Sequence, residues 1–297
     1  MPKTARPRRS VLYMPGSNIR ALEKAKTIAA DGLILDLEDA VAPDAKEIAR
    51  RQVCQAVKGG GYGMRELIIR VNGLATPWGY QDIVEASRSG ADAILLPKVE
   101  SADAIRHMES IMRANGAPDE MAIWAMMETP RSVLASEQIA ASTPRMQCLV
   151  MGTSDLAKEL DCAHTRERLP FITSLGLCLL AARAYGLAIV DGVYLDLKDE
   201  AGFEFACQQG AEMGFDGKTL IHPNQVAQCN QVFTPRPEDV EWSRRIIAAH
   251  QEAAARGEGV AVVDGKLIEN LHVESARRLV KMAEAIQQMR APAQVPA

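Results

Sequence analysis

Two acidic residues, Glu128 and Asp155, occupy positions typical of ligands for a hard metal ion. Glu128 directly follows the apolar run 122–127, and Asp155 lies four residues beyond the run 147–151. If these runs are neighbouring parallel strands, both carboxylates reach the same end of the sheet. Oxygen ligands without cysteine or paired histidines favour Mg²⁺, or Mn²⁺, over zinc. The sequence therefore predicts a magnesium site held by Glu128 and Asp155.

Helix capping is the alternative interpretation of such acids. A short acidic side chain after a strand often accepts hydrogen bonds from the first N–H groups of the next helix, and Asp39, Asp44 and Asp155 all suit that role. Capping is less natural for Glu128, because a Thr-Pro pair follows it. The ligand interpretation is therefore favoured for Glu128, while capping stays open for Asp155.

Three further acids, Asp36, Glu38 and Asp39, lie around the end of another apolar run, 32–37. Carboxylates gathered at one mouth raise one another's pKa unless cations neutralise them. We expect these three to surround the metal ligands and not to bind the metal themselves.

Arg70 lies near the end of the run 67–71, which is otherwise apolar. Its guanidinium would project into the acidic mouth, where it could bind a substrate carboxylate or a developing enolate oxygen. As an alternative, it is a structural counter-ion of Asp36 or Glu38. The sequence allows both roles at once.

Tyr13, Arg20 and Lys24 lie on the first expected loop and helix. The two basic residues are four positions apart and share one helical face, so they could grip the phosphates of a large acyl carrier. The alternative is an ordinary solvated face. His222 also ends an expected strand and could be a general base or a structural histidine.

The segments that must position these residues alternate between short apolar runs and longer amphipathic stretches. This alternation predicts parallel strands joined by helices, and eight runs predict a closed (β/α)8 barrel, a TIM barrel. In that fold, catalytic residues gather at the C-terminal ends of the strands. A doubly wound open sheet is the alternative, but no glycine-rich dinucleotide fingerprint follows the first run. The runs are 10–14, 32–37, 67–71, 93–96, 122–127, 147–151, 188–193 and 215–221.

The chain divides into four expected segments. Residues 1–9 are a disordered start, 10–233 the barrel, 234–290 a C-terminal extension and 291–297 a tail. Within the extension, a hairpin turned at Asp264-Gly265 is expected between two helices. The extension is longer than barrel closure requires and could be a lid or an oligomer arm.

Composition excludes several classes of protein. The 297 residues are 47% hydrophobic with a formal net charge of −4, so no extended basic face for nucleic acid is expected. No stretch reaches the roughly 18 apolar residues of a membrane span. Six scattered cysteines without metal-ligand spacing indicate buried thiols in a reducing cytoplasm.

Several motifs together resemble the citrate lyase β-subunit-like family of the HpcH/HpaI aldolase superfamily. The resemblance runs over about residues 9–286. The motifs that carry it are Leu12-Tyr13-Met14-Pro15-Gly16, Leu35-Asp36-Leu37-Glu38-Asp39-Ala40-Val41, Arg70-Val71-Asn72-Gly73, Pro97-Lys98, Glu128-Thr129-Pro130 and Ile221-His222-Pro223-Asn224-Gln225.

The resemblance implies a Mg²⁺-dependent carbon–carbon lyase of β-hydroxyacyl-CoA thioesters such as malyl-CoA or citramalyl-CoA, assembled as a trimer or hexamer. By matched position, Glu128 and Asp155 would bind the metal, and Arg70 would hold the substrate and stabilise an enolate. The remaining implied residues of the substrate and CoA site are Tyr13, Arg20, Lys24, Glu128, Thr219 and Leu220.

One position departs from the family pattern. In the resembling family, the C-terminal extension covers the active site of a neighbouring subunit and delivers a catalytic aspartate, where this chain has Glu269. The extra methylene can displace an acid by more than an ångström, and misplacement on that scale costs about a hundredfold in rate. Glu269 either replaces the aspartate in the lyase reaction or marks a different chemistry. The alternatives are a citrate lyase β subunit acting on a citryl-acyl carrier protein and a malyl-CoA thioesterase.

Overall fold

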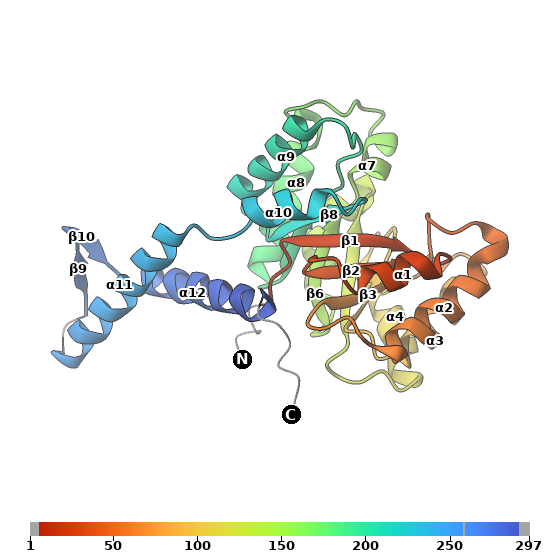
Figure 1. Cartoon of the computed structure of the whole chain (residues 1–297), viewed down its shortest axis with the longest axis horizontal. Helices are drawn as coiled ribbons and strands as arrows, with labels where there is room; N and C mark the ends of the chain where they lie inside the picture. Colours follow the sequence, from red (N-terminus) through yellow and green to blue (C-terminus); the bar gives the residue numbers. More distant parts are fainter. Residues whose placement is uncertain (1–5, 258, 291–297) are drawn as a thin grey trace. The chain divides into compact units, whose positions relative to one another are not determined.

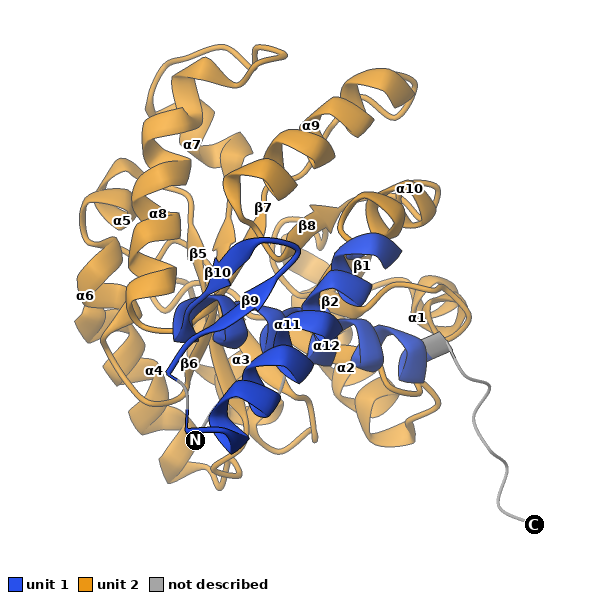
Figure 2. Ribbon diagram, turned by 90° about the vertical axis from the view of Figure 1, so that its left-hand side faces the viewer, with its two compact units in different colours: residues 1–7, 234–297 blue, residues 8–233 orange. Residues whose placement is uncertain are grey.

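The computed structural model describes residues 6–257 and 259–290, which divide into two compact units. Among these residues, one unit is Arg8–Phe233, and the other joins Arg6 and Pro7 to residues 234–257 and 259–290 (Figure 2).

Arg8–Phe233 contains a closed barrel of eight parallel strands, arranged in the order of the sequence and flanked by helices (Figure 1). The prediction of a TIM barrel is confirmed, and the predicted runs differ from the strands by at most two residues at all ends. The strands are β1 (Ser10–Pro15), β2 (Gly32–Asp36), β3 (Glu66–Arg70), β4 (Ala93–Leu96), β5 (Ala122–Met127), β6 (Met146–Met151), β7 (Ala188–Asp191) and β8 (Gly217–Leu220).

The barrel helices follow the amphipathic segments, with one addition. The added helix, α7 (Thr153–Glu159), follows β6 and was not predicted, because it is short and lies close to a strand end. Helix α10 (Gln225–Val232) follows β8 and ends before Pro235, where the proline predicts the end of a helix. The other helices are α1 (Ile19–Ala25), α2 (Lys46–Gly59), α3 (Gly79–Ser87), α4 (Ala102–Ala114), α5 (Pro130–Leu134), α6 (Ser136–Ala140), α8 (Ile172–Ala184) and α9 (Glu200–Met213).

Alternate residues of the strands β1 to β7 belong to different cores. Val11 of β1 packs in a cluster with Ile34, Ile68 and Trp124, whereas Leu12 belongs to the larger cluster that includes helix residues. Successive side chains of a strand point to opposite faces, so residues two positions apart share a face. The first cluster therefore fills the barrel interior, and the second lies between the strands and the helices.

This two-residue period directs the polar strand-end residues. Tyr13 follows Val11 by two positions, and Asp36 and Arg70 follow Ile34 and Ile68 in the same way. All three side chains consequently point to the inside of the barrel at the C-terminal ends of their strands. The strand-end arrangement of the predicted site thus follows from the strand register.

The start of the chain contradicts the prediction of disorder over 1–9 in part. Arg8 and Arg9 are buried: Arg8 forms a two-pronged ion pair with Glu66 at 2.7 and 2.8 Å, and Arg9 pairs with Asp31 at 2.7 and 2.8 Å. The prediction is wrong for these two residues, because bidentate pairing offsets the cost of burying a guanidinium. Residues 1–5 lie outside the described part of the chain.

The C-terminal unit has a small core of its own. Its elements are α11 (Pro237–Ala255), β9 (Ala261–Val263), β10 (Lys266–Ile268) and α12 (Asn270–Arg290). The predicted hairpin is confirmed: β9 and β10 pair antiparallel, and Asp264 and Gly265 both adopt the positive φ that a tight two-residue turn requires. Val263 and Ile268 of the hairpin pack with helix residues such as Ile246 and Val273. The predicted tail, 291–297, lies outside the described residues.

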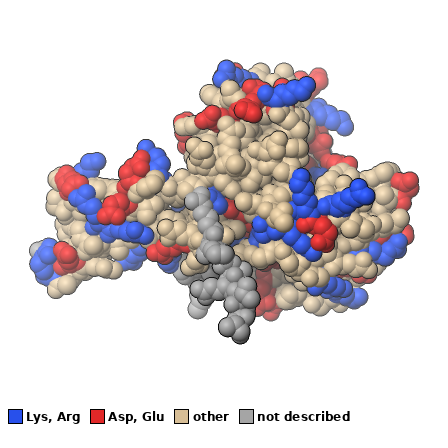
Figure 3. Space-filling model, viewed as in Figure 1, with Lys and Arg blue, Asp and Glu red and all other residues tan. Residues whose placement is uncertain are grey.

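Charges of both signs are interspersed over the face of the molecule drawn in Figure 3. Within the described part of the chain, no helix combines the length and the apolar character that crossing a membrane requires.

Candidate active site

A cavity of about 380 Å³ opens among the strand-end residues of the barrel. Seven of the residues predicted for the site line it: Tyr13, Asp36, Asp39, Arg70, Glu128, Asp155 and Thr219. Apolar side chains complete the lining, mainly Met126, Met151, Val193, Leu195 and Ile221. The cavity therefore combines a charged group of residues with an apolar wall contributed largely by the segments after β7 and β8.

Asp36 holds Arg70 in place. Two hydrogen bonds of 2.7 Å join the Arg70 guanidinium to the two carboxylate oxygens of Asp36, which is fully buried. The same carboxylate accepts hydrogen bonds from the main-chain N–H groups of Glu38 and Ala40. Asp36 thus fixes both the guanidinium and the loop after β2.

The third nitrogen of Arg70, Nη1, faces the remaining acids. It lies 2.9 Å from Glu38 Oε2 and 3.4 Å from Asp39 Oδ2. The contact with Glu38 is an ion pair whose angles do not make it a hydrogen bond, since Glu38 Oε2 is buried without a hydrogen-bond partner. Arg70 is therefore a counter-ion to Asp36 and also presents Nη1 toward the cavity, so the two interpretations of Arg70 are compatible.

Tyr13 lies beside Arg70, whose guanidinium carbon is 4.8 Å from the centre of the tyrosine ring. The Tyr13 hydroxyl contacts the sulfur of Met126 at 3.8 Å, and sulfur is a weak acceptor. Burial raises the pKa of Tyr13 above its ordinary value, although Arg70 counteracts the shift. The hydroxyl therefore stays protonated and can donate a hydrogen bond into the cavity.

Glu128 is 3% exposed and reaches the cavity floor from the end of β5. Burial raises the pKa of Glu128 to about 7, although the Lys98 charge and the Lys98 N–H counteract the shift. Gly152 makes room for this carboxylate, because a Cβ there would lie 2.6 Å from Glu128 Oε2. A buried carboxylate with so high a pKa gains most from a cation beside it.

Asp155 lies in the first turn of α7, with 32% of its side chain exposed. The capping interpretation is wrong for Asp155, because Gly152 occupies the N-cap and no side chain caps this helix. The Asp155 carboxylate instead accepts a 2.6 Å hydrogen bond from the Lys98 ammonium.

Lys98 is a site residue that we did not assign a role from the sequence. Its main-chain N–H donates to Glu128 Oε1 at 2.7 Å, while its side-chain ammonium contacts Asp155 at 2.6 Å and Glu38 at 3.5 Å. The backbone of Lys98 has a φ of 49°, which is unusual for a residue with a side chain. Its position after β4 in a Pro-Lys pair was the available signal.

The acids of the cavity suit a divalent cation. Glu128 and Asp155 offer oxygen atoms only, and a positive group, the Lys98 ammonium, already touches Asp155. Among residues 6–257 and 259–290, no group of three or more acidic, histidine or cysteine side chains has the arrangement of a metal site. The protein would thus supply two carboxylates and leave other positions to water and substrate, a mode that Mg²⁺ accepts readily.

Several predicted residues do not line this cavity. Glu38 is not among the lining residues and lies on the loop that Lys46 holds through hydrogen bonds to the carbonyls of Leu37 and Glu38. Arg20 and Lys24 are exposed on α1. The prediction that the Leu220 side chain lines the site is wrong, because Leu220 is fully buried in the outer core while its neighbour Thr219 faces inward.

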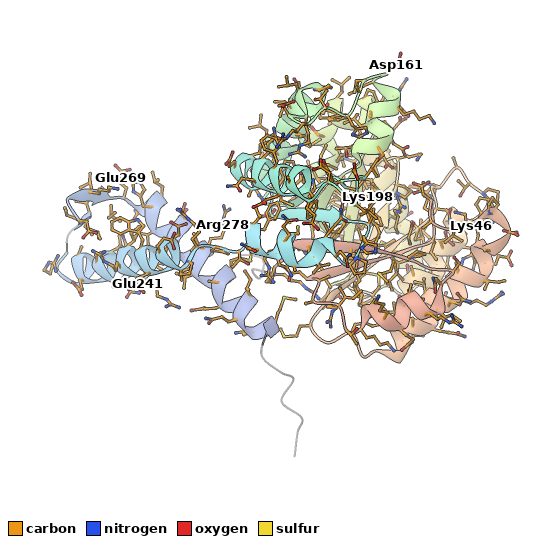
Figure 4. The ribbon with its side chains drawn as sticks, turned by 45° about the horizontal axis from the view of Figure 1, so that its top comes forward. Lys46, Asp161, Lys198, Glu241, Glu269 and Arg278 are labelled. Carbon is orange, nitrogen blue, oxygen red and sulfur yellow. The ribbon has the colours of Figure 1, made fainter. Side chains whose placement is uncertain are left out.

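Glu269, the predicted acid of the C-terminal unit, is exposed at the end of β10, next to the start of α12 (Figure 4). Its main-chain N–H donates to His272 Nδ1 at 3.0 Å. Its role at an active site stays a prediction.

Two other charged strand-end residues pair with each other. Lys218 and Asp191 are buried and 2.8 Å apart, and Arg168 also bonds Asp191 at 2.6 and 2.8 Å. Neither Asp191 nor Lys218 lines the cavity. The convergence of polar strand-end residues on the cavity therefore does not extend to this pair.

Comparison with known proteins identifies the family. Residues 9–223 match the HpcH/HpaI aldolase/citrate lyase family. The chain belongs to this family. Among its members, a (3S)-malyl-CoA thioesterase of Cereibacter sphaeroides is 52% identical over 291 residues, which cover 98% of this chain and 100% of the relative. An L-malyl-CoA/beta-methylmalyl-CoA lyase of the same species is 35% identical and covers 95% of this chain and 96% of its own.

Solved structures of the HpcH/HpaI family share the architecture. The protein CitE from Mycobacterium tuberculosis, in complex with magnesium, acetoacetate and coenzyme A, superposes with a TM-score of 0.72 at 25% identity and covers 96% of this chain and 100% of its own. The recognition of the family from its motifs is thereby confirmed.

Proposed function

We propose that this chain hydrolyses the thioester of malyl-CoA or a close analogue in a Mg²⁺-dependent reaction. The main support is sequence identity. This chain is 52% identical to a malyl-CoA thioesterase over nearly the full length of both chains, and 35% identical to a malyl-CoA lyase. Our main prediction was a lyase, with the thioesterase as an alternative. The comparisons support the thioesterase better.

Glu128 and Asp155 would hold the ion. Their oxygen-only donor set supports this assignment, as does the magnesium in the complex of the M. tuberculosis relative. When bound, Mg²⁺ acts as a Lewis acid that polarises an oxygen atom of the substrate. Mn²⁺ would fit the same ligands.

Arg70 and Tyr13 would orient the substrate. Arg70 Nη1 is held rigidly by the pairing of its other nitrogens with Asp36, so it can donate to a carboxylate or to the thioester oxygen without reorganising. The Tyr13 hydroxyl adds a second donor beside it. Arg20 and Lys24, exposed on α1, would bind the phosphates of CoA.

Glu269 would move the proton. In the reaction we propose, a water oxygen bonds to the thioester carbon while Glu269 accepts the proton that the water loses. The carbon–sulfur bond then breaks, and the departing CoA thiolate takes the proton from Glu269. A carboxylate one methylene longer than the family's aspartate reaches more than an ångström further, a shift large enough to address a different reacting atom.

We further propose that a second copy of the chain delivers Glu269, as in the family that the sequence resembles. The carboxylate is exposed at the end of a hairpin whose outer residues Val262 and Leu267 are also exposed. The active site would then be shared within a homo-oligomer.

A product assay with malyl-CoA and Mg²⁺ tests the proposal. Hydrolysis gives free CoA and malate in equal amounts, with no acetyl-CoA. Cleavage of the carbon–carbon bond gives acetyl-CoA and glyoxylate, with no free thiol. Formation of acetyl-CoA and glyoxylate without release of CoA would overturn the thioesterase assignment in favour of the lyase. Parallel reactions with citramalyl-CoA and a citryl-acyl carrier protein define the acyl group.

A further inference from the structure

We propose that Lys98 is a positioning residue whose ammonium group competes with a divalent cation for Asp155, and that Glu38 accepts the ammonium when the cation binds. This inference rests on the cation site of the proposed function. Nothing in the comparisons assigns a role to Lys98.

The first support is that one residue contacts three acids of the site. The main-chain N–H of Lys98 bonds Glu128 Oε1 at 2.7 Å, and its ammonium lies 2.6 Å from Asp155 Oδ2 and 3.5 Å from Glu38 Oε1. Because the bond to Glu128 uses the main chain, the side chain can move without releasing Glu128.

The second support is that Glu38 can receive the ammonium. Its Oε1 atom already lies 3.5 Å from the Lys98 ammonium, whereas its Oε2 atom is the one that pairs with Arg70 at 2.9 Å. Glu38 is held in place, because Lys46 bonds its main-chain carbonyl at 2.7 Å and Arg70 pairs with its side chain. Asp155 is freed by a movement of the Lys98 side chain alone.

The third support is the cost of the local backbone. Lys98 adopts a φ of 49°, where glycine or asparagine is more usual. This conformation aims the N–H at Glu128 and places the side chain against Asp155. A residue held in an unfavourable conformation at a cluster of charged groups is typical of a functional constraint.

The consequence is competition between ammonium and cation for Asp155. Removing the Lys98 charge takes away the competitor, so the free protein should bind the cation more tightly. The Lys98 side chain is 49% exposed, and an exposed ion pair of this kind corresponds to about a fivefold effect on affinity. If Lys98 were only a surface lysine, its removal would leave the affinity unchanged.

Titration of the full-length protein with Mn²⁺, followed by electron paramagnetic resonance, tests the inference without catalysis. Lys98→Met is the test variant, because methionine keeps a similar length and pays the same backbone cost at positive φ. We expect its Kd for Mn²⁺ to be about fivefold lower than that of the wild type. Lys98→Arg, which keeps the charge, should restore the wild-type value.

Lys158→Met is the matched control, because it removes an exposed positive charge from α7, the helix of Asp155. Its Kd should equal that of the wild type. A second measurement is the rise in melting temperature on adding Mg²⁺, which should be larger for Lys98→Met than for the wild type.

Three results would overturn the inference. An unchanged or higher Kd for Lys98→Met would mean that the Lys98 ammonium does not compete with the cation for Asp155. An equal decrease of Kd for Lys158→Met would mean that the loss of any nearby positive charge raises cation affinity, so the contact between Lys98 and Asp155 would not be its cause. A wild-type protein that binds no Mn²⁺ overturns the cation site of the proposed function itself, which distinguishes that failure from a failure of Lys98.

Discussion

In the barrel, Glu128 is 3% exposed and Asp36 is fully buried, whereas Glu269 in the C-terminal unit is exposed to solvent. The barrel acids have fixed partners: Asp36 bonds Arg70 twice, and Glu128 accepts the N–H of Lys98. In the part of the chain that the structure describes, no hydrogen bond or ion pair is recorded for the Glu269 carboxylate. One region has a preorganised site, and the other offers a free acid.

The difference matches two chemical tasks. Holding a cation and orienting a thioester requires groups whose positions are set before the substrate arrives, and burial within a closed barrel sets them. Proton transfer requires a group that can meet water and substrate in turn, and an exposed carboxylate on a hairpin suits that task. The comparison predicts that changes in the two regions will have different kinetic signatures.

The largest effect is expected from Glu128→Gln. Gln keeps the shape but lacks the charge, so the variant should lose cation binding and lower kcat about a thousandfold, equivalent to ~4 kcal/mol of transition-state stabilisation. Enzyme activity and Mn²⁺ titration provide the measurement. Glu100→Gln is the control, since Glu100 is exposed after β4 and should behave as wild type. Retention of wild-type turnover by Glu128→Gln would remove the cation site from the mechanism.

A smaller loss is expected from Glu269→Ala. Loss of a general base typically lowers kcat about a hundredfold, and because Glu269 lies outside the cavity's fixed network, KM and cation affinity should change little. Steady-state kinetics with malyl-CoA test this split. Glu274→Ala, an exposed acid on α12, is the matched control. A higher KM with unchanged kcat would make Glu269 a substrate-binding residue and contradict its proposed role.

Mixing the two defective variants distinguishes a shared active site from a self-contained one. If a neighbouring copy supplies Glu269, subunit exchange between Glu128→Gln and Glu269→Ala creates sites with an intact barrel and an intact acid, and activity returns. Native mass spectrometry confirms that mixed oligomers have formed. Mixed oligomers without regained activity would show that each chain uses its own Glu269.

The predictable part of the site follows from residue type and strand period. The eight apolar runs predicted the barrel, and the acids and Arg70 at their ends are among the residues that line the cavity. The same period predicts that only one of the neighbours Thr219 and Leu220 can face inward, a constraint that we did not apply when assigning both to the site.

Long basic side chains were harder to place. The contacts of Lys98 depend on a positive φ and on three acids that follow other strands, and neither feature is visible in the local sequence. Arg8 and Arg9 were mistaken for a solvated start, because their partners Glu66 and Asp31 are distant in sequence. Such ion pairs form between residues that the fold brings together. The sequence therefore identifies the charged residues but does not show which of them pair.

A fourth prediction concerns the independence of the two units. Val262 and Val263 are adjacent on β9, but Val262 is 65% exposed and Val263 is 6% exposed in the small core. Val263→Ala removes two buried carbons, which at ~0.8 kcal/mol each corresponds to about a fifteenfold loss of protection. Hydrogen exchange should show this loss in α11 and α12 but not in β1–β8, and Val262→Ala should show almost none. Equal loss in the barrel strands would contradict the independence of the units.

The last prediction concerns pH and the buried carboxylate Glu128. Burial raises the pKa of Glu128 to about 7, so below this pH the carboxyl is increasingly protonated. A carboxyl must lose its proton to bind a metal ion, and cation affinity therefore falls as the pH decreases. The expected slope is a loss of up to about tenfold in affinity per pH unit below 7, with little change above it.

Mn²⁺ titrations of the free protein between pH 5.5 and 8 measure this slope. Glu100→Gln should follow the wild-type curve, because its carboxylate lies outside the cavity. In Glu128→Asp, the shorter side chain draws the carboxyl back from Lys98 and alters its burial, so the midpoint of the curve should move while the slope stays that of one proton. An affinity that is constant over this range would mean that Glu128 is already ionised at pH 5.5, and burial would then not be what distinguishes it from the exposed acid of the C-terminal unit.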